Sequence, residues 1–247
     1  FRAHVQTGAP AQEPWSFGPE VEAISRAQIE LRYALLPYIY TLMVEAHETG
    51  MPPLRPLVLH FQHAQTAPHI SDQLLLGPSL LFAPVLAPGA TTRSVYLPAG
   101  GWRDLYTGAL HEGPGIVELP APLSRLPALA RANAVLPTWP PLSSTSDPHP
   151  HTLFLDLYPV AGAPERSFAL VLDDDAPAPT TFRQTYALAA TYSGATLSIA
   201  AQEAPHDPGH RTLHLRFRGA VPPNSVLLDG AALTPAPDLD HVQSNAG

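Results

Sequence analysis

Proline is spread along the whole of this chain, and this feature restricts its possible folds more than any other. The sequence contains 31 prolines in 247 residues, about one residue in eight, where ~5% is usual. Proline lacks a backbone N–H and breaks helices, whereas turns and sheet edges tolerate it. After Thr49 we therefore expect many short strands rather than helices.

One long segment, 19–49, departs from this expectation. Its apolar residues recur at spacings of three and four, which is typical of an amphipathic helix. Pro19 suits the first turn and Gly50 the end, and Pro37 predicts a kink or split because it cannot donate a backbone hydrogen bond. No later segment predicts a second helix for the wide apolar face. We therefore expect its partner to lie upstream of Phe1, in a part that this chain does not include.

From Leu54 onwards, short apolar or alternating segments are bounded by Gly or Pro, which is typical of β-strands. The first set comprises residues 56–61, 73–76, 79–83, 94–97 and 115–119, with a further pair around Asn133. Residues 140–150 are rich in Ser and Pro and predict a linker. The second set comprises residues 152–158, 167–172, 186–190, 195–199, 211–217 and 225–228, and its spacing predicts a β-sandwich.

The charge and cysteine content exclude several classes of function. A net charge of −8 and a pI near 5.8 oppose nucleic-acid binding, and the 13 basic residues lie singly, so no polybasic membrane patch forms. Without cysteine there is no disulfide, thiolate metal site or cysteine nucleophile. We expect a cytoplasmic protein that binds neither nucleic acid nor a membrane; the sequence sets no oligomeric state.

An ordered series of short motifs runs through roughly the first 140 residues. It begins with Arg2-Ala-His4, Glu13-Pro-Trp15 and Leu31-Arg-Tyr-Ala-Leu-Leu-Pro-Tyr38. It continues with Arg55-Pro-Leu57, Gln73 to Gly77, Phe82-Ala-Pro-Val85, Trp102-Arg-Asp104 and Arg131 to Pro137. In this order the motifs resemble glycoside hydrolase family 31, the α-glucosidase and α-xylosidase group. The triplet Asp173 to Asp175 resembles the acidic Asp-Asp-Gly turn of that family.

The resemblance implies a mostly β fold: the end of a (β/α)8 barrel, present as one long helix, followed by two C-terminal β-sandwich domains. The expected divisions are 1–53 for the last barrel loop and helix, 54–140 for the proximal β domain and 141–247 for the distal one. The barrel strands upstream in the same polypeptide would then be the missing partner of the helix.

Two positions depart from the family pattern. The family usually has Gly where this chain has Asn133, at a position that we expect to have a positive φ. Asn is the next most tolerant residue there, so the turn can survive. Asp175 replaces the usual Gly of the acidic turn, which counts against carrying a function over from that turn.

The resemblance implies a retaining glycosidase, in which a nucleophilic carboxylate and an acid/base carboxyl group lie about 5–5.5 Å apart. In the family both Asp residues precede the match to Arg2-Ala-His4, and the Trp-x-Asp-Met-Asn-Glu type motif of the nucleophile is absent here. Trp102-Arg-Asp104 matches a structural turn instead. We therefore assign no catalytic residue to this chain and expect it to be inactive alone.

His4 is the residue that the motif carries over, because the matching His of the family hydrogen-bonds a glucose hydroxyl at the cleavage subsite. An imidazole can both donate and accept, which suits a hydroxyl. Arg2 is expected to order the loop. Trp15 and Phe17 are expected to pack the loop on the helix, with lining of the outer sugar pocket as the alternative. The pairs His60/His63, His149/His151 and His206/His210 lack accompanying carboxylates, so we expect no metal and no cofactor.

These observations favour the C-terminal part of an α-glycosidase, with an α-glucosidase acting on oligosaccharides as the first hypothesis. Within the enzyme class, α-xylosidase, transglycosylase and lyase activities stay open, because the residues that select between them lie largely upstream. The alternative from another class is a noncatalytic β-sandwich module for carbohydrate binding or assembly.

Overall fold

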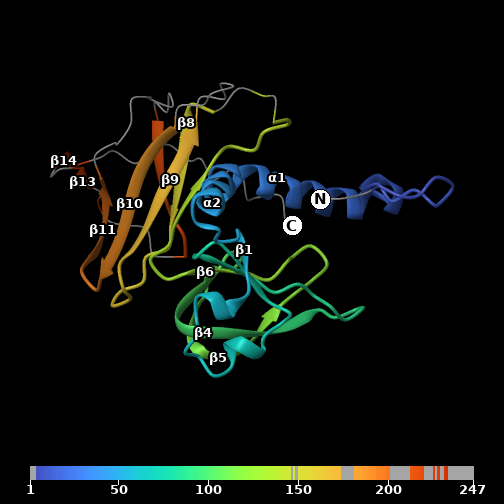
Figure 1. Cartoon of the computed structure of the whole chain (residues 1–247), viewed down its shortest axis with the longest axis horizontal. Coiled ribbons are helices and arrows are strands. Elements are labelled where there is room, and N and C mark those ends of the chain that lie inside the picture. The colour runs from blue at the N-terminus through green and yellow to red at the C-terminus, as the bar shows by residue number, and fades with distance from the viewer. Residues whose placement is uncertain are drawn as a thin grey trace.

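A computed structural model describes residues 4–145, 147, 150–173, 181–200, 212–219, 225, 227–228 and 231–232. Within these ranges the chain forms helices near its N-terminal end and β-sheets in the remainder (Figure 1). The expected mostly β class is therefore confirmed. In Figure 1 one helix, α1, projects away from the sheets, while the next, α2, lies against them.

The long helix predicted over 19–49 is split in two. A 3-10 turn, η1 (Pro14–Phe17), precedes α1 (Pro19–Ala34), and α2 (Leu36–Thr49) ends at Gly50, whose φ is 77°. The break at Leu35 places Pro37 in the first turn of α2, where its missing N–H costs no hydrogen bond. The predicted effect of Pro37 is confirmed. No helix in the described ranges has the length and apolarity needed to cross a membrane.

The expectation that the helix packs only on an upstream partner is wrong for α2. Its residues Pro37, Tyr38, Thr41 and Leu42 are buried against β-sheets of this same chain. The Tyr38 ring lies 5.0 Å from the Phe168 ring, and Thr41 Oγ1 accepts a hydrogen bond of 3.0 Å from the backbone N–H of Val171. By contrast, α1 buries none of its residues. An upstream partner for α1 stays a prediction.

A six-stranded antiparallel sheet forms the lower body in Figure 1, with strand order β1-β2-β3-β6-β4-β5. Its strands are β1 (Leu54–Arg55), β2 (Leu74–Leu76), β3 (Leu80–Phe82), β4 (Thr92–Asp104), β5 (Leu110–Pro120) and β6 (Ala128–Arg131). All were predicted as strands except β1, which falls one residue before the predicted segment 56–61.

That segment, 56–61, is not a strand. Its centre forms the 3-10 helix η2 (Leu57–Leu59), in which the backbone N–H of Leu59 donates to the carbonyl of Pro56 at 3.1 Å. Proline at the head of the segment cannot donate to a sheet ladder and suits the start of a tight turn, and a second 3-10 helix, η3 (Ala67–His69), follows.

Two three-stranded sheets and a short hairpin form the second body. One sheet has the order β11-β10-β9 and the other β12-β8-β7, with β8 and β12 parallel. The strands are β7 (Val135–Thr138), β8 (Thr152–Leu157), β9 (Arg166–Asp173), β10 (Thr181–Thr191), β11 (Gly194–Ile199) and β12 (Thr212–Phe217), and the hairpin pairs β13 (Leu227–Leu228) with β14 (Ala231–Ala232). Strand β7 precedes residue 140, yet it pairs with β8. The domain boundary at 140 stays a prediction.

The bodies share residues because two strands of the six-stranded sheet are buried on both faces. Leu81 pairs with Leu129, and both face the core of that sheet, which also contains Trp102. Their neighbours Leu80 and Ala130 point to the opposite face, since side chains alternate along a strand. That face belongs to the core formed by α2 and strands β7 to β10.

Asn133 is the point at which the chain passes from the first body to the second. It is fully buried and has a φ of 58°, so the predicted positive φ is confirmed. Its Oδ1 accepts from the N–H of Val160 at 2.9 Å, and its Nδ2 donates to the carbonyls of Ala163 and Pro164 at 3.0 and 3.1 Å. A glycine would satisfy the backbone at this position but would lose all three bonds.

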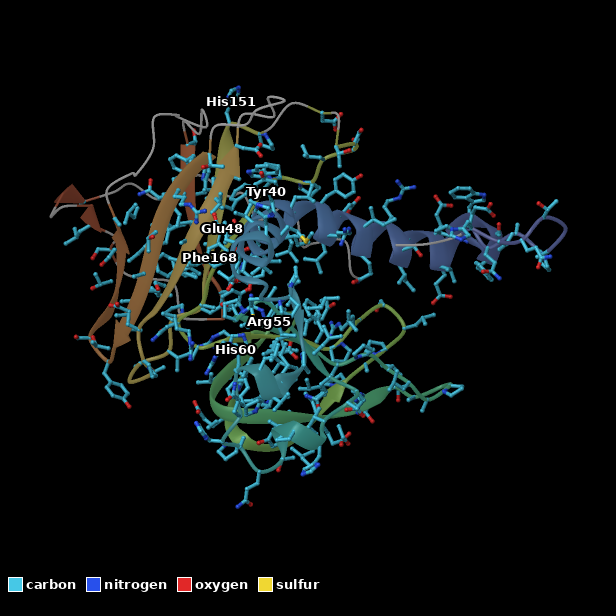
Figure 2. All side chains as sticks on the ribbon, viewed as in Figure 1. Tyr40, Glu48, Arg55, His60, His151 and Phe168 are labelled. Atoms are coloured by element: carbon cyan, nitrogen blue, oxygen red, sulfur yellow. The ribbon has the colours of Figure 1, made fainter. Side chains whose placement is uncertain are left out.

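Arg55 joins α2 to the first body. Its guanidinium forms an ion pair with Glu45 of α2, and its Nη1 donates to His60 Nε2 at 2.9 Å. Figure 2 shows Arg55 and His60 side by side below α2. Burial, and then the positive charges of Arg55, Arg131 and Arg166, lower the pKa of His60. The imidazole is therefore neutral, with its proton on Nδ1.

Asp156 on β8 binds two arginines from β12 and the residue after it. Arg216 contacts both carboxylate oxygens at 2.7 Å, and Arg218 Nε contacts Oδ1 at 2.7 Å. The carboxylate is buried, whereas both arginines are partly exposed. These ion pairs cross the parallel β8–β12 contact, so they fix its register together with the backbone ladder.

We predict that asparagine is the most stabilising residue at position 133, followed by glycine and then by alanine. Asn133→Gly leaves the buried N–H of Val160 without its acceptor and should cost about 2 kcal/mol. Asn133→Ala loses the same bonds, and alanine also tolerates the left-handed φ of this position less well than asparagine or glycine, for a total of about 3–4 kcal/mol. Denaturant unfolding measures both values. A glycine variant as stable as the natural chain would contradict the role given to the side chain.

We predict that His60 makes the protein less stable in acid. Because its pKa is lowered by folding, the unfolded chain takes up the proton first as the pH falls below about 6.5, and the free energy of unfolding decreases. In His60→Gln the amide oxygen can still accept from Arg55, without a titration. The loss of thermal stability between about pH 7.5 and about pH 5.5 should therefore be smaller in that variant. The exposed neighbour offers a control: His63→Gln should keep the natural loss, and equal losses in both variants would refute the assignment.

Candidate functional site

His4 lies on the loop that leads to η1, and its side chain is exposed. The segment that precedes α1 lies at the end of that helix far from the sheets (Figure 1). Trp15 and Phe17 follow His4, and they are 67% and 57% exposed. Both rings are thus mostly exposed in this chain, and their expected packing of the loop on the helix stays a prediction. An exposed imidazole and two exposed aromatic rings on one short segment could form part of a surface that contacts sugar, since aromatic side chains combine apolar area with polar edges.

The role of His4 as a substrate contact stays a prediction. Arg2, which was expected to order the same loop, lies outside the described residues. No carboxylate pair in the described ranges accompanies His4 on its loop, and Glu13 there accepts a hydrogen bond of 3.3 Å from Ser16.

The motif Trp102-Arg-Asp104 ends strand β4 and leads into the structural turn that was expected. Asp104 Oδ1 accepts from the backbone N–H groups of Tyr106 and Thr107 at 2.8 and 2.7 Å. The carboxylate therefore closes a turn. Trp102 is fully buried, and its indole N–H donates to the carbonyl of Pro98 at 2.8 Å.

Arg103, in the same motif, connects the first body to two loops of the second. It donates to the carbonyls of Gly219 at 2.6 Å and Pro159 at 3.2 Å, and to its own turn at Gly108 at 2.9 Å. Burial lowers its pKa. All three partners are backbone oxygens, which is a structural use of a guanidinium rather than a catalytic one.

The histidine pairs do not form a metal centre in the described part of the chain. His60 is held by Arg55, His63 is exposed, and no group of three metal-ligating side chains occurs among the described residues. His151 lies on the loop before β8 (Figure 2), while His149, His206 and His210 lie outside the described residues. Of the acidic triplet only Asp173 is described, where it accepts from the hydroxyl of Tyr40; Asp174 and Asp175 lie outside.

Two cavities were not predicted from the sequence. One, of about 220 Å³, lies between α2 and β9 and is lined by Glu48 and Arg183, which form an ion pair across it. The other, of about 240 Å³, lies between the two bodies and is lined by Arg131 and Arg166. Arg131 begins the motif Arg131 to Pro137, so the sequence pattern drew attention to one of these two arginines. Arg166 follows 35 residues later and has no local pattern that relates it to Arg131.

Comparison with known proteins gives matches to two domains of one family. The Glycosyl hydrolase family 31 C-terminal domain matches residues 50–136, and the Glycosyl hydrolases family 31 TIM-barrel domain matches residues 1–42. The order, barrel before C-terminal domain, is the order of the motifs in the sequence.

Individual relatives agree with this result. Alpha-glucosidase 2 from Bacillus thermoamyloliquefaciens is 35% identical over 175 residues, which is 71% of this chain and 22% of that enzyme. The structure of a GH31 dextranase from Flavobacterium johnsoniae, a mutant complexed with isomaltotriose, matches with a TM-score of 0.83 at 28% identity, over 96% of this chain and 30% of that one. A GH31 alpha-xylosidase from Xanthomonas citri matches with a TM-score of 0.73 at 29% identity, over 91% and 26%.

The chain thus spans between about a fifth and a third of the length of these relatives. Both family matches fall on the segments that carry the quoted motifs, so the resemblance noted in the sequence is confirmed. The chain belongs to glycosyl hydrolase family 31, of which it contains the end of the TIM barrel and the C-terminal β region.

Proposed function

We propose that this chain is the C-terminal portion of a retaining α-glycosidase, an α-glucosidase that releases terminal α-linked glucose from oligosaccharides. The observation that carries the proposal is the paired match to the barrel and C-terminal domains of family 31, with 35% identity to an α-glucosidase over 175 residues. The isomaltotriose complex of the dextranase supports an oligosaccharide as the substrate class.

The chemistry in this proposal belongs to the barrel of the same polypeptide. A retaining mechanism needs a nucleophilic carboxylate and an acid/base carboxyl group about 5–5.5 Å apart. We assign neither group to the residues of this chain. Asp104, the carboxylate of the motif Trp102-Arg-Asp104, closes a turn instead. The part given to this chain is to support the barrel through α1 and α2, and to contribute His4 to the sugar pocket.

An α-xylosidase is the second candidate, because the structure of such an enzyme matches this chain at 29% identity. The two activities differ in whether the pocket accepts the hydroxymethyl group of glucose. Comparing kcat/KM for p-nitrophenyl α-glucoside and α-xyloside with the polypeptide that includes the barrel decides between them. Both candidates require an upstream barrel that carries the nucleophile. The preceding nucleotide sequence tests this requirement, because it should encode an in-frame Trp-x-Asp-Met-Asn-Glu motif.

We predict that the purified 247-residue chain alone hydrolyses no α-glucoside. A glycosidase that lacks its two carboxylates loses both the nucleophile and the proton donor. The measurement is release of p-nitrophenol from the α-glucoside, compared with a polypeptide that includes the upstream barrel. If the 247-residue chain hydrolysed the α-glucoside above a buffer blank, with a rate that saturates in substrate, the assignment of both carboxylates to the upstream barrel would be refuted.

We predict that His4→Ala in the active polypeptide lowers kcat/KM for maltose by about tenfold to a hundredfold. A loss of this size corresponds to about 1.4–2.7 kcal/mol of transition-state stabilisation, as expected for a hydrogen bond that strengthens in the transition state. His63→Ala removes an exposed histidine from a loop of the first body and is the matched control. Equal effects of the two substitutions would contradict a sugar contact by His4.

A further inference from the structure

The cavity of about 240 Å³ between the two bodies has a wall from each of them. One wall is formed by Gly100 and Gly101 of β4, and the other by the loop 160–164 that connects β8 to β9. Arg131, the last residue of β6, and Arg166, the first residue of β9, both line it. Two positively charged guanidinium groups thus line the same small cavity. Their mutual repulsion destabilises this arrangement unless an anion lies between them.

Arg131 presents an unused hydrogen-bonding edge. Its guanidinium lies over the rings of Phe61 and Trp102, 4.7 and 5.8 Å from their centres, and these cation–π contacts use its flat face. Among the described residues it forms no hydrogen bond or ion pair through its side chain. Burial, and then the charge of Arg166, lower the pKa of Arg131 to about 10, so it is still a cation at neutral pH.

Arg166 also uses only part of its guanidinium in hydrogen bonds to the described residues. Its Nε donates to the carbonyl of Ala132 at 3.1 Å, and within the described part of the chain no carboxylate pairs with its guanidinium. Burial lowers the pKa of Arg166. The bond to Ala132 fixes the side chain at the cavity floor and leaves the terminal N–H groups available to a ligand.

The walls of the cavity are held rigidly. Asn133 binds the loop 160–164 through three side-chain hydrogen bonds of 2.9 to 3.1 Å, and the N–H of Ala132 donates to the carbonyl of Gly101 at 2.8 Å. A site whose backbone is already in place loses little conformational entropy when it binds a ligand.

We propose that this cavity binds a small oxyanion, a phosphate or carboxylate group of a soluble compound, between the guanidinium groups of Arg131 and Arg166. A planar guanidinium offers parallel N–H donors that match two oxygens of such a group. The volume is below the roughly 300–1,000 Å³ of pockets for larger ligands, so the site suits a single anionic group rather than an oligosaccharide.

Glu112 also lines this cavity, and its charge opposes an anion. Its carboxylate lies beside Gly101, where an added Cβ would come within 3.2 Å of Oε1, and its side chain is exposed. It forms no ion pair with either arginine in the described chain. Glu112 therefore leaves a net positive charge in the cavity, and Glu112→Gln should raise the affinity for an oxyanion.

The experiment is calorimetric and thermal titration of the protein with inorganic phosphate and, separately, with glucuronate, both against sodium chloride at equal ionic strength. We expect a saturable signal and a rise in Tm with one or both oxyanions and none with chloride. Saturation with phosphate alone assigns a tetrahedral oxyanion, and saturation with glucuronate alone assigns a carboxylate. If neither phosphate nor glucuronate gave a saturable signal, the proposal would be overturned.

Substitutions place the signal at the cavity. Arg166→Gln and Arg131→Gln should each weaken binding at least tenfold, whereas Arg26→Gln, which removes an exposed arginine of α1, should leave it unchanged. An equal response in all three variants would overturn the proposal.

A further pair of variants avoids the risk that loss of an arginine impairs folding. Ala161 lines the cavity, so Ala161→Glu places a carboxylate beside both guanidinium groups. This variant should have a higher Tm than Ala161→Gln in the absence of oxyanion, and should no longer respond to phosphate or glucuronate. A lower Tm than Ala161→Gln, or an undiminished response to the oxyanion, would refute the site.

Discussion

The burial of Tyr38 holds the two β bodies to one helix. Its ring packs on Phe168 of the second body, and its hydroxyl donates to the carbonyl of Leu76 in the first at 2.9 Å. Gly77 makes this possible, because a Cβ there would lie 2.4 Å from the hydroxyl oxygen. One turn later Thr41 reaches β9. A helix that is buried on two sides must leave the line of α1, and the break before Pro37 permits this.

Arginine forms several of the contacts that join separate segments of the described chain, and the sequence contains no lysine. Arg103 binds backbone carbonyls, Arg55 binds a carboxylate and an imidazole, and Arg131 lies on aromatic rings. A guanidinium has five N–H donors in a fixed plane and a flat face, so a single side chain can meet several fixed groups that an ammonium could not. The same property makes a cavity between two such side chains a site for anions.

Local features of this fold could be predicted from the sequence, and long-range ones could not. Proline chemistry gave the split at Pro37, and the family pattern gave the positive φ of Asn133. The strand predicted over 56–61 was wrong because apolar content does not distinguish a strand from a 3-10 turn. Neither the helix-to-sheet contact of α2 nor the meeting of Arg131 with Arg166 has a sequence signature, since both depend on pairing between distant segments.

The ion pairs of Asp156 have a consequence for the order in which the chain can fold during synthesis. The carboxylate is buried on β8, but its two arginines are added 60 and 62 residues later. Until β12 leaves the ribosome, β8 has an open edge and an uncompensated charge, which together cost several kcal/mol. The second body can therefore reach its final packing only after translation has passed Arg218, whereas the last strand of the six-stranded sheet, β6, ends at Arg131.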